Sequence, residues 1–261
     1  MSRPIYRRSI GQYIGSVFQK VHYLSLVRMR TYRHPWTDFV RRYLVDRGTY
    51  PAVVEVKDSA GQTCAINVRS RFDVLTIHEI FVWRCYPASG DERAIIDLGS
   101  NIGVSMAYFL ANAPQATVYG VEPLEENLVL ARANTEKYAD RAQLVEAAVL
   151  DHAGTTSFSV EPTGRYSGVG LDLDETRTVP CIHINELVER VVSEHGQVDL
   201  IKVDIEGAEG TVLRAIDPAA FEKIGTIAIE GDEVPHDFLL ERGYTHHLHE
   251  SGVHWYDRVP R

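Results

Sequence analysis

The chain has 261 residues, of which 44% are hydrophobic, and a formal net charge of −9. That apolar content can fill one large α/β domain, or one domain with an appendage. The three cysteines lie far apart without C-x-x-C spacing, which excludes a disulfide framework and a cysteine zinc signature and indicates a reducing, cytoplasmic setting. The sequence contains no apolar run of about 18 residues that would span a membrane, and no clean signal peptide.

Charge is distributed unevenly along the chain. Residues 1–47 contain ten Lys or Arg and two acids, a charge of +8, which leaves −17 for the rest. An acidic body argues against nucleic acid as a substrate, because phosphates are repelled. Helices are predicted over 13–32 and 36–46. We expect these helices to pack on the acidic body or to form a homodimer contact. A more specific alternative is that they form a lid or a substrate-recognition segment. Docking on a membrane surface is the third alternative.

Alternating apolar residues predict two strands over 53–57 and 63–68, with a hairpin turn at 58–61. We therefore divide the chain into a basic helical segment with a β-hairpin over 1–68 and an α/β domain over 69–261.

An apolar helical stretch over 69–86 opens the second part of the chain. It carries two acids, Asp73 and Glu79, just ahead of the segment that holds the main motif. Acids there are more often helix caps or exposed residues than catalysts, but their position keeps both as candidates.

The stretch 94–123 has the pattern strand, tight turn, helix, strand. Gly99 and Gly103 lie in the turn, and Glu122 follows the second strand. Two glycines let the backbone approach a ligand closely, and the N-terminus of the helix is expected to present free N–H groups. Glu122 can accept both hydroxyl protons of a ribose, so the unit predicts a nucleoside site.

The spacing of the glycines discriminates between nucleosides. A dinucleotide site needs the three glycines of G-x-G-x-x-G, and only two are present. The pattern D-x-G-x-x-x-G, which starts at Asp97, resembles motif I of the Rossmann-like methyltransferases, which bind S-adenosylmethionine, a ligand without phosphate. An ordinary strand-to-helix turn is the alternative. The expected cofactor-binding residues are Asp97, Gly99, Ser100, Asn101, Gly103, Glu122, Pro123, Ala148 and Asp204.

A helix is predicted over 125–138 and a third strand over 144–150, with Ala148 near its end beneath the adenine. Residues 155–160 and 178–184 are predicted to form an antiparallel pair.

The polar loop 161–176 between these strands is a candidate for substrate contacts. After the pair, Asn185 is the expected N-cap of a helix over 186–193.

The segment DLIKVDI, residues 199–205, is predicted to be a buried parallel strand. Asp204 lies near its end, where ligands bind in open α/β sheets. Glu206 and Glu209 are three apart and are expected to share one face of the next helix.

A fifth strand is predicted over 226–230, and it ends in Glu230, with His236 shortly after. Residues 243–249 and 252–259 are predicted to close the chain as a pair of strands.

From Arg69 onward, the chain resembles the FkbM family of S-adenosylmethionine-dependent methyltransferases. The likeness rests on FDVLTIHEIF, IIDLGSNIGVSMAYF, VYGVEPLEEN, AAVLDHAGTTSF, VDLIKVDIEGAEGTVL and IAIEG. The resemblance implies a Rossmann-like class I methyltransferase fold, with a mostly parallel seven-stranded sheet and an antiparallel last strand. The N-terminal helices and β-hairpin have no clear counterpart in the family.

The resemblance further implies O-methylation of a hydroxyl group on a sugar, glycan or natural-product scaffold. Such an acceptor needs a base or a metal to lower its proton affinity. We expect Asp204, Glu230 or His236 to be catalytic, with an obligatory divalent metal not favoured. A non-catalytic S-adenosylmethionine-binding or scaffold domain is the alternative function, followed by a nicotinamide oxidoreductase.

Overall fold

The computed structural model describes residues 41–42, 45, 47–58, 60–161, 167–171, 173–231, 234–249 and 251–259. The helices expected over 13–32 and 36–46 fall outside these residues, apart from positions 41, 42 and 45. In the part of the chain that is described, no helix has the length and apolar character needed to cross a membrane.

A seven-stranded sheet forms the centre of the molecule, and its order is β12-β13-β11-β10-β3-β4-β5. In that order the strands are β12 (Tyr244–Leu248), β13 (His254–Arg258), β11 (Ile224–Ile229), β10 (Val198–Val203), β3 (Ala94–Leu98), β4 (Thr117–Val121) and β5 (Ala142–Val145). The neighbours from β11 to β5 pair in parallel, whereas β13 is antiparallel to both β11 and β12. The expected Rossmann-like sheet with an antiparallel last strand is therefore confirmed.

The central strands are buried on both faces, as their apolar sequences predict. Successive side chains of β3 enter different cores: Ile95 lies in one hydrophobic cluster, and Ile96 and Leu98 lie in the other. This alternation holds β3 at the middle of the molecule, so that the turn after it has a rigid support.

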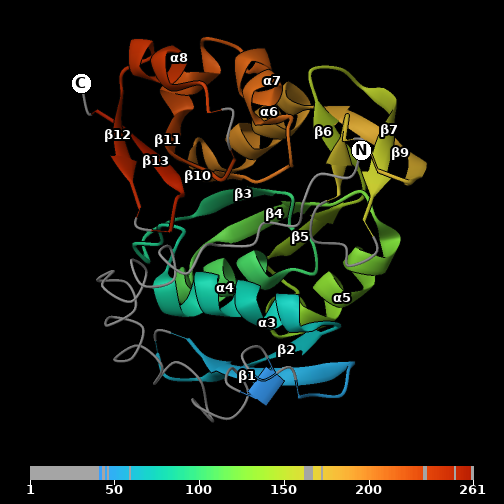
Figure 1. The fold of residues 1–261 in the computed structure, drawn as a ribbon. Helices are drawn as coiled ribbons and strands as arrows, with labels where there is room; N and C mark the ends of the chain where they lie inside the picture. The colour runs from blue at the N-terminus through green and yellow to red at the C-terminus, as the bar shows by residue number, and fades with distance from the viewer. Residues whose placement is uncertain are drawn as a thin grey trace, which may run out of the picture.

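Helices cover both faces of the sheet (Figure 1). One layer contains α3 (Arg71–Ile77), the π-helical turn η3 (His78–Trp83), α4 (Val104–Asn112), α5 (Glu125–Thr135) and η4 (Glu136–Tyr138). The other contains α6 (Ile184–His195), α7 (Glu209–Ala215), η5 (Ala220–Lys223) and α8 (His236–Glu241). The hairpin β1 (Ala52–Lys57) and β2 (Thr63–Val68) lies outside the first layer, and its inward side chains share a core with α4.

The strand expected over 144–150 is wrong, because the chain divides it between two sheets. Val145 is the last residue of β5 to pair with β4, which ends at Val121 before Pro123. Residues beyond Val145 therefore have no partner in the main sheet. They continue as β6 in a second sheet of order β6-β9-β7-β8. Its strands are β6 (Ala148–Leu150), β7 (Gly154–Val160), β8 (Gly168–Val169) and β9 (Glu175–His183), and the expected antiparallel pair is β7 with β9.

The expected N-cap of α6 is also wrong. The helix begins at Ile184, and the Nδ1 of His183 accepts a hydrogen bond from the Asn185 N–H at 3.1 Å. The side-chain oxygen of Asn185 accepts from the Asp217 N–H at 3.0 Å instead. Because β9 runs directly into the helix, the cap position falls two residues earlier than the residue type suggested.

The buried side chain of Asn134 in α5 connects the hairpin to the turn after β3. Its oxygen accepts from the backbone and side-chain nitrogens of Asn67 at 2.7 and 2.9 Å. Its nitrogen donates to the carbonyls of Ile102 and Asn67 at 2.8 and 3.2 Å. One amide thus fixes the distance between β2 and the turn.

We predict that Asn134→Ala lowers the free energy of unfolding by about 1–3 kcal/mol, because buried partners of the amide lose their hydrogen bonds. Urea denaturation measures the change. The control is Lys137→Ala, which removes an exposed side chain that bonds Gln62 on the same hairpin. A loss no larger than that of the control would contradict the role of Asn134.

Candidate functional site

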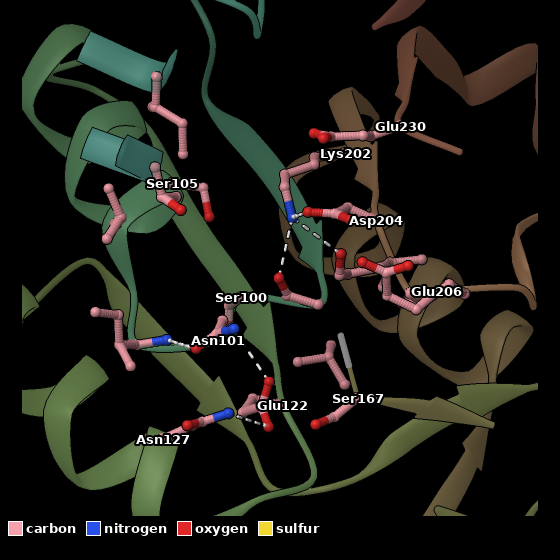
Figure 2. A pocket seen from close by; sticks show the side chains of 18 of the residues that line it. Ser100, Asn101, Ser105, Glu122, Asn127, Ser167, Lys202, Asp204, Glu206 and Glu230 are labelled. Atoms are coloured by element: carbon pink, nitrogen blue, oxygen red, sulfur yellow. Dashed lines mark hydrogen bonds and ion pairs between the residues drawn. The ribbon is translucent and has the colours of Figure 1, made fainter. Parts of the chain in front are cut away.

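A pocket lies at the carboxyl ends of the central parallel strands (Figure 2). Among the residues expected to bind the cofactor or to act in catalysis, those that line it are Gly99, Ser100, Asn101, Glu122, Pro123, Ala148, Asp204 and Glu230. Asp97, Gly103 and His236 are not among its lining residues. The segments that meet here are far apart in the sequence, and they meet because parallel strands end at one edge of the sheet.

Both glycines of the turn are required by geometry. Gly99 has φ +77°, and a Cβ at this position would lie 1.8 Å from the backbone oxygen of Asp204. Gly103 has φ +81°, and a Cβ there would lie 2.9 Å from the Cα of Ala131 on α5. Gly99 therefore permits contact between two strand ends, and Gly103 permits contact between two helices. Gly103 supports the site from behind, instead of lining it as expected.

The N–H groups of the glycine turn that precedes α4 are used within the protein. The N–H groups of Gly99 and Ser100 both donate to the Val121 carbonyl, at 3.1 and 3.0 Å. The next three residues also use their N–H groups within the protein: Asn101 donates to Glu122 at 3.1 Å, Ile102 to the Asn101 side chain at 2.8 Å, and Gly103 to the Ser100 carbonyl at 2.8 Å. With five consecutive donors occupied and a carboxylate beside them, this turn is unsuited to a phosphate group.

Lys202 is fully buried in β10 and joins the strand ends beneath the pocket. Its ammonium lies 3.0 Å from the carboxylate of Asp97 and 3.3 Å from that of Asp204. It also donates to the carbonyls of Leu98 and Gly99 at 3.2 and 3.0 Å. Burial alone would lower the pKa of Lys202, but the negative charges of Asp97 and Asp204 raise it above its ordinary value, so the side chain stays protonated.

The same contacts correct the role of Asp97, which was expected to bind a cofactor. Its carboxylate is fully buried, pairs with Lys202 and accepts from the hydroxyl of Ser105 at 2.5 Å. Asp97 therefore fixes Lys202 and the first turn of α4.

Tyr86 connects the two acids that close neighbouring strands. Its hydroxyl donates to Glu230 at 2.6 Å and lies 3.4 Å from a carboxylate oxygen of Asp204. Burial, followed by the charges of Asp204 and Glu230, raises the pKa of Tyr86 well above its usual value. Tyr86 is thus a neutral donor that holds both carboxylates at the pocket.

Glu122 is 5% exposed and lies on the opposite side of the pocket from Glu230 (Figure 2). Its Oε1 accepts from the Leu124 N–H at 3.0 Å and from Asn127 Nδ2 at 2.9 Å, and its Oε2 accepts from Asn101. Burial raises the pKa of Glu122 to about 7, and these hydrogen bonds limit the increase. A carboxylate has about four acceptor sites, so three internal bonds leave one for a ligand. Glu122 alone therefore has room to accept one ribose hydroxyl proton, and not both as the sequence suggested.

Two further oxygen atoms in the pocket are available. The hydroxyl of Ser100 and the side-chain oxygen of Asn127 are buried and have no hydrogen-bond partner within the described residues. Buried polar atoms are rarely left unsatisfied, so such atoms in a pocket indicate that a ligand or water completes them.

An apolar surface adjoins this polar group. Ala148 and Phe158 line the pocket beside Val169, and the three belong to a hydrophobic cluster that includes Leu124. The end of the pocket near Glu122 therefore combines hydroxyl-binding oxygens with a surface suited to a flat, apolar ring.

The other acids of the motifs have different positions. Glu209 is 2% exposed, and its carboxylate accepts from the N–H groups of Ile205 and Gly207 at 3.2 and 3.0 Å. Glu206 has φ +49° and lies before α7, so the expectation that both acids share a helix face is wrong. Asp73 accepts from the N–H groups of Arg69 and Ser70 and caps α3, as the simpler interpretation held. Both Asp73 and Glu79 line the pocket.

His236 lies apart from the pocket, in contact with Tyr256: its Nδ1 is 2.5 Å from the phenol oxygen. It is not positioned to act on a group bound between Asp204 and Glu230.

Sequence reasoning missed Lys202, Tyr86 and Asn127. A usable signal existed for Lys202, since a lysine within an otherwise apolar buried strand needs an acidic partner. Tyr86 and Asn127 lie in segments where many polar residues are exposed, so their residue type did not distinguish them.

We predict that Lys202→Met lowers the free energy of unfolding by about 3–5 kcal/mol, because it leaves Asp97 buried without a counter-charge. Adding Asp97→Asn should restore much of the loss, since the uncompensated charge is then removed. Urea denaturation measures both variants, with the exposed Lys223→Met as control. A double variant no more stable than the single one would contradict the pairing.

Comparisons with known proteins identify the family of the chain. Residues 97–249, more than half of the chain, match the methyltransferase FkbM domain model. The chain is 24% identical over 200 residues to "Methyltransferase 1" of Beauveria bassiana (strain ARSEF 2860), covering 67% of this chain and 80% of the relative. It is 24% identical over 193 residues to "31-O-demethyl-FK506 methyltransferase FkbM" of Streptomyces tacrolimicus, covering 60% and 73%.

Among solved structures, the precorrin-6y C5,15-methyltransferase of Geobacter metallireducens GS-15 matches with a TM-score of 0.40 at 11% identity, covering 74% of this chain and 90% of that one. The segment that matches the FkbM domain model contains the glycine turn, Glu122, Lys202, Asp204 and Glu230. The chain belongs to the FkbM methyltransferase family.

Proposed function

We propose that this methyltransferase uses S-adenosylmethionine to methylate a hydroxyl group of a sugar, glycan or natural-product scaffold. The observation that carries the proposal is the set of groups at the end of the pocket near Glu122. Every backbone donor from Gly99 to Gly103 is occupied, while oxygen atoms of Ser100, Glu122 and Asn127 remain available. Such a surface suits a ligand that donates hydroxyl groups and carries no phosphate.

The chain's residues fit the nucleoside part of that cofactor. The free acceptor site of Glu122 and the unpartnered oxygen of Asn127 can each take one ribose hydroxyl. Ala148, Phe158 and Val169 offer an apolar surface for the adenine. The same features argue against a nicotinamide dinucleotide, whose pyrophosphate needs unoccupied N–H groups at the turn.

When bound, S-adenosylmethionine supplies an electrophilic methyl group on a sulfonium centre. Asp204 and Glu230 lie at adjacent strand ends, held by Lys202 and Tyr86. Their negative charge favours a cation in the pocket, and either carboxylate can accept the proton of an incoming hydroxyl group. Tyr86 orients both acids, so the proton acceptor has a defined position before the acceptor molecule arrives.

Support for a hydroxyl acceptor comes from the relatives. The Streptomyces tacrolimicus protein is named for an O-methylation, and it shares 24% identity with this chain. No feature of the described residues favours a purely structural or scaffold role over this one.

We predict that binding of methylthioadenosine, which has the adenine and ribose without a titratable amino acid, weakens as the pH falls below about 7. Burial raises the pKa of Glu122 to about 7, and a ligand that donates hydroxyl protons binds the ionised form better. Below this pH, binding must release a proton from Glu122, so the affinity should decrease by up to about tenfold per pH unit. Above it, the affinity should be constant.

Calorimetric titrations from about pH 5.5 to about pH 8.5 measure this dependence. Glu122→Gln should bind more weakly and with a flat pH profile, whereas Glu126→Gln, an exposed acid four residues later in the first turn of α5, should retain the dependence. A flat profile in the unaltered protein would contradict the assignment of Glu122.

We further predict that Asp204→Asn or Glu230→Gln lowers turnover by about 10²–10⁴, while binding of S-adenosylhomocysteine changes little. Turnover is measured as S-adenosylhomocysteine release with a panel of sugars, nucleotide sugars and hydroxylated macrocycles. Tyr86→Phe should give a smaller loss, because it removes only the orientation of the acids. The exposed Asp237→Asn, on α8 outside the pocket, is the control. Near-normal turnover in both acid variants would show that alignment alone drives the reaction.

A further inference from the structure

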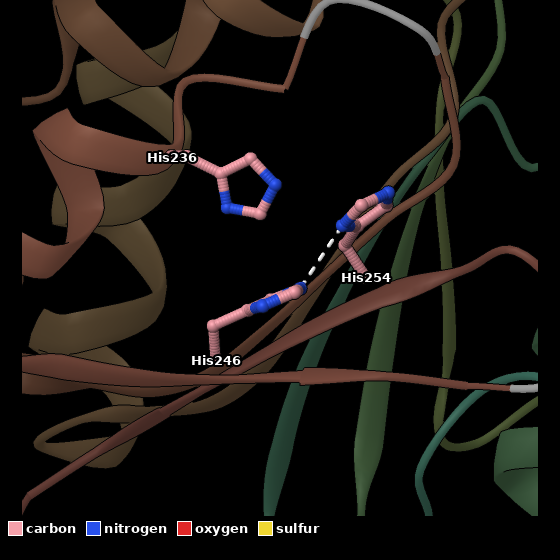
Figure 3. A group of neighbouring side chains, drawn as sticks. All are labelled: His236, His246 and His254. Carbon is pink, nitrogen blue, oxygen red and sulfur yellow. Dashed lines mark hydrogen bonds between the residues drawn. The ribbon is translucent and has the colours of Figure 1, made fainter.

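Three histidines from separate elements come together outside the pocket (Figure 3). His236 opens α8, His246 lies in β12, and His254 begins β13. His246 pairs with Tyr256 across the two strands, and His254 is two residues before Tyr256, so the two histidines lie on one face of the hairpin. The first residue of α8 meets that face.

The imidazole nitrogens are as close as metal ligands would be. Each histidine offers one nitrogen within 4.8 Å of the other two. The Nε2 of His246 lies 3.0 Å from the Nδ1 of His254. Three nitrogens bound to one tetrahedral zinc ion at about 2.0–2.1 Å would lie roughly 3.3–3.4 Å apart. The His246–His254 pair already has this spacing, and the nitrogen of His236 lies within 4.8 Å of both, so it would have to move closer to bind the same ion.

Tyr256 supplies an outer partner for one of these histidines. Its buried hydroxyl lies 2.5 Å from the Nδ1 of His236. If that Nδ1 carries the proton and donates to Tyr256, the Nε2 of His236 keeps its lone pair on the side of the other two rings (Figure 3). Metal-binding histidines commonly have such a partner on the second nitrogen, and it fixes both tautomer and ring orientation.

The surroundings also favour neutral rings. Burial lowers the pKa of His246 and the pKa of His254 below the ordinary value for histidine. The charges of neighbouring histidines lower both pKa values further. Neutral imidazoles retain the lone pairs that a metal ion needs, and imidazole ligands suit zinc and its neighbours among the transition metals.

We propose that His236, His246 and His254 bind one divalent transition-metal ion, for which zinc is the best fit, with a fourth position left for water. The proposal is independent of the proposed function, because none of the three histidines lines the pocket. A bound ion would join the start of α8 to the terminal hairpin. Ser251 and Val253, which precede His254, do line the pocket, so the ion would stabilise one wall of it.

The competing interpretation is a hydrogen-bonded histidine cluster without a metal. It accounts for the close approach of His246 and His254, since one neutral ring can donate to the other. A hydrogen bond between His246 and His254 does not by itself explain why a nitrogen of His236 also lies beside the pair. The two interpretations differ in whether the folded chain takes up zinc stoichiometrically.

The test is a calorimetric titration of the full chain, purified with chelator and then freed of it, with zinc chloride. We expect one zinc ion per chain and a higher melting temperature in the presence of zinc, because a ligand specific to the folded state stabilises it. His246→Ala and His254→Ala should each weaken binding by more than the roughly 10–100-fold expected when only an outer partner is lost. Tyr256→Phe should weaken it within that smaller range.

The matched control is His247→Ala, next to His246 in β12. Its side chain is exposed and lies 3.6 Å from Asp257, apart from the cluster. It should bind zinc as the unaltered chain does. Absence of stoichiometric zinc binding to the folded, unaltered chain would overturn the proposal without any variant. Binding that survives both His246→Ala and His254→Ala, or that His247→Ala abolishes, would also overturn it.

Discussion

The buried ion pairs of Lys202 are the interaction on which the site depends. A protonated lysine inside a parallel sheet is stable only with compensating charge. Asp97 provides it from the neighbouring β3, and Asp204 provides it from the end of β10 itself. Because Lys202 also binds the carbonyls of Leu98 and Gly99, the start of the glycine turn is held against the end of β10. One side chain thus sets the position of the glycine turn relative to Asp204 at the end of β10.

The two ends of the pocket have different polar groups. At Glu122, internal hydrogen bonds occupy the N–H groups of the turn from Gly99 to Gly103 and most of the carboxylate, which leaves acceptors for a few hydroxyl protons. At Asp204 and Glu230, two carboxylates share the neutral hydroxyl of Tyr86. Under the proposed function, the nucleoside of S-adenosylmethionine would occupy the first environment and its sulfonium cation the second.

Much of the fold could be predicted from the sequence, because apolar runs such as DLIKVDI identify buried parallel strands and Gly99 and Gly103 mark a close turn. The division of residues 144–150 between two sheets could not, since it depends on where the neighbouring β4 ends. Local patterns single out Ser100, Asn101, Glu122 and Asp204, and all four line the pocket. The supporting role of Asp97 and the contributions of Lys202, Tyr86 and Asn127 depend on contacts between distant segments, which no local pattern encodes.

The central claim is that this pocket binds a phosphate-free nucleoside through acceptor oxygens. A competition titration tests it most directly: S-adenosylhomocysteine is bound to the unaltered chain, and adenosine and NAD⁺ are then added in separate experiments. The account predicts one S-adenosylhomocysteine per chain, displaced by adenosine at sufficient concentration and not by NAD⁺. Displacement by NAD⁺ at concentrations similar to those of adenosine, or no binding of S-adenosylhomocysteine, would contradict it.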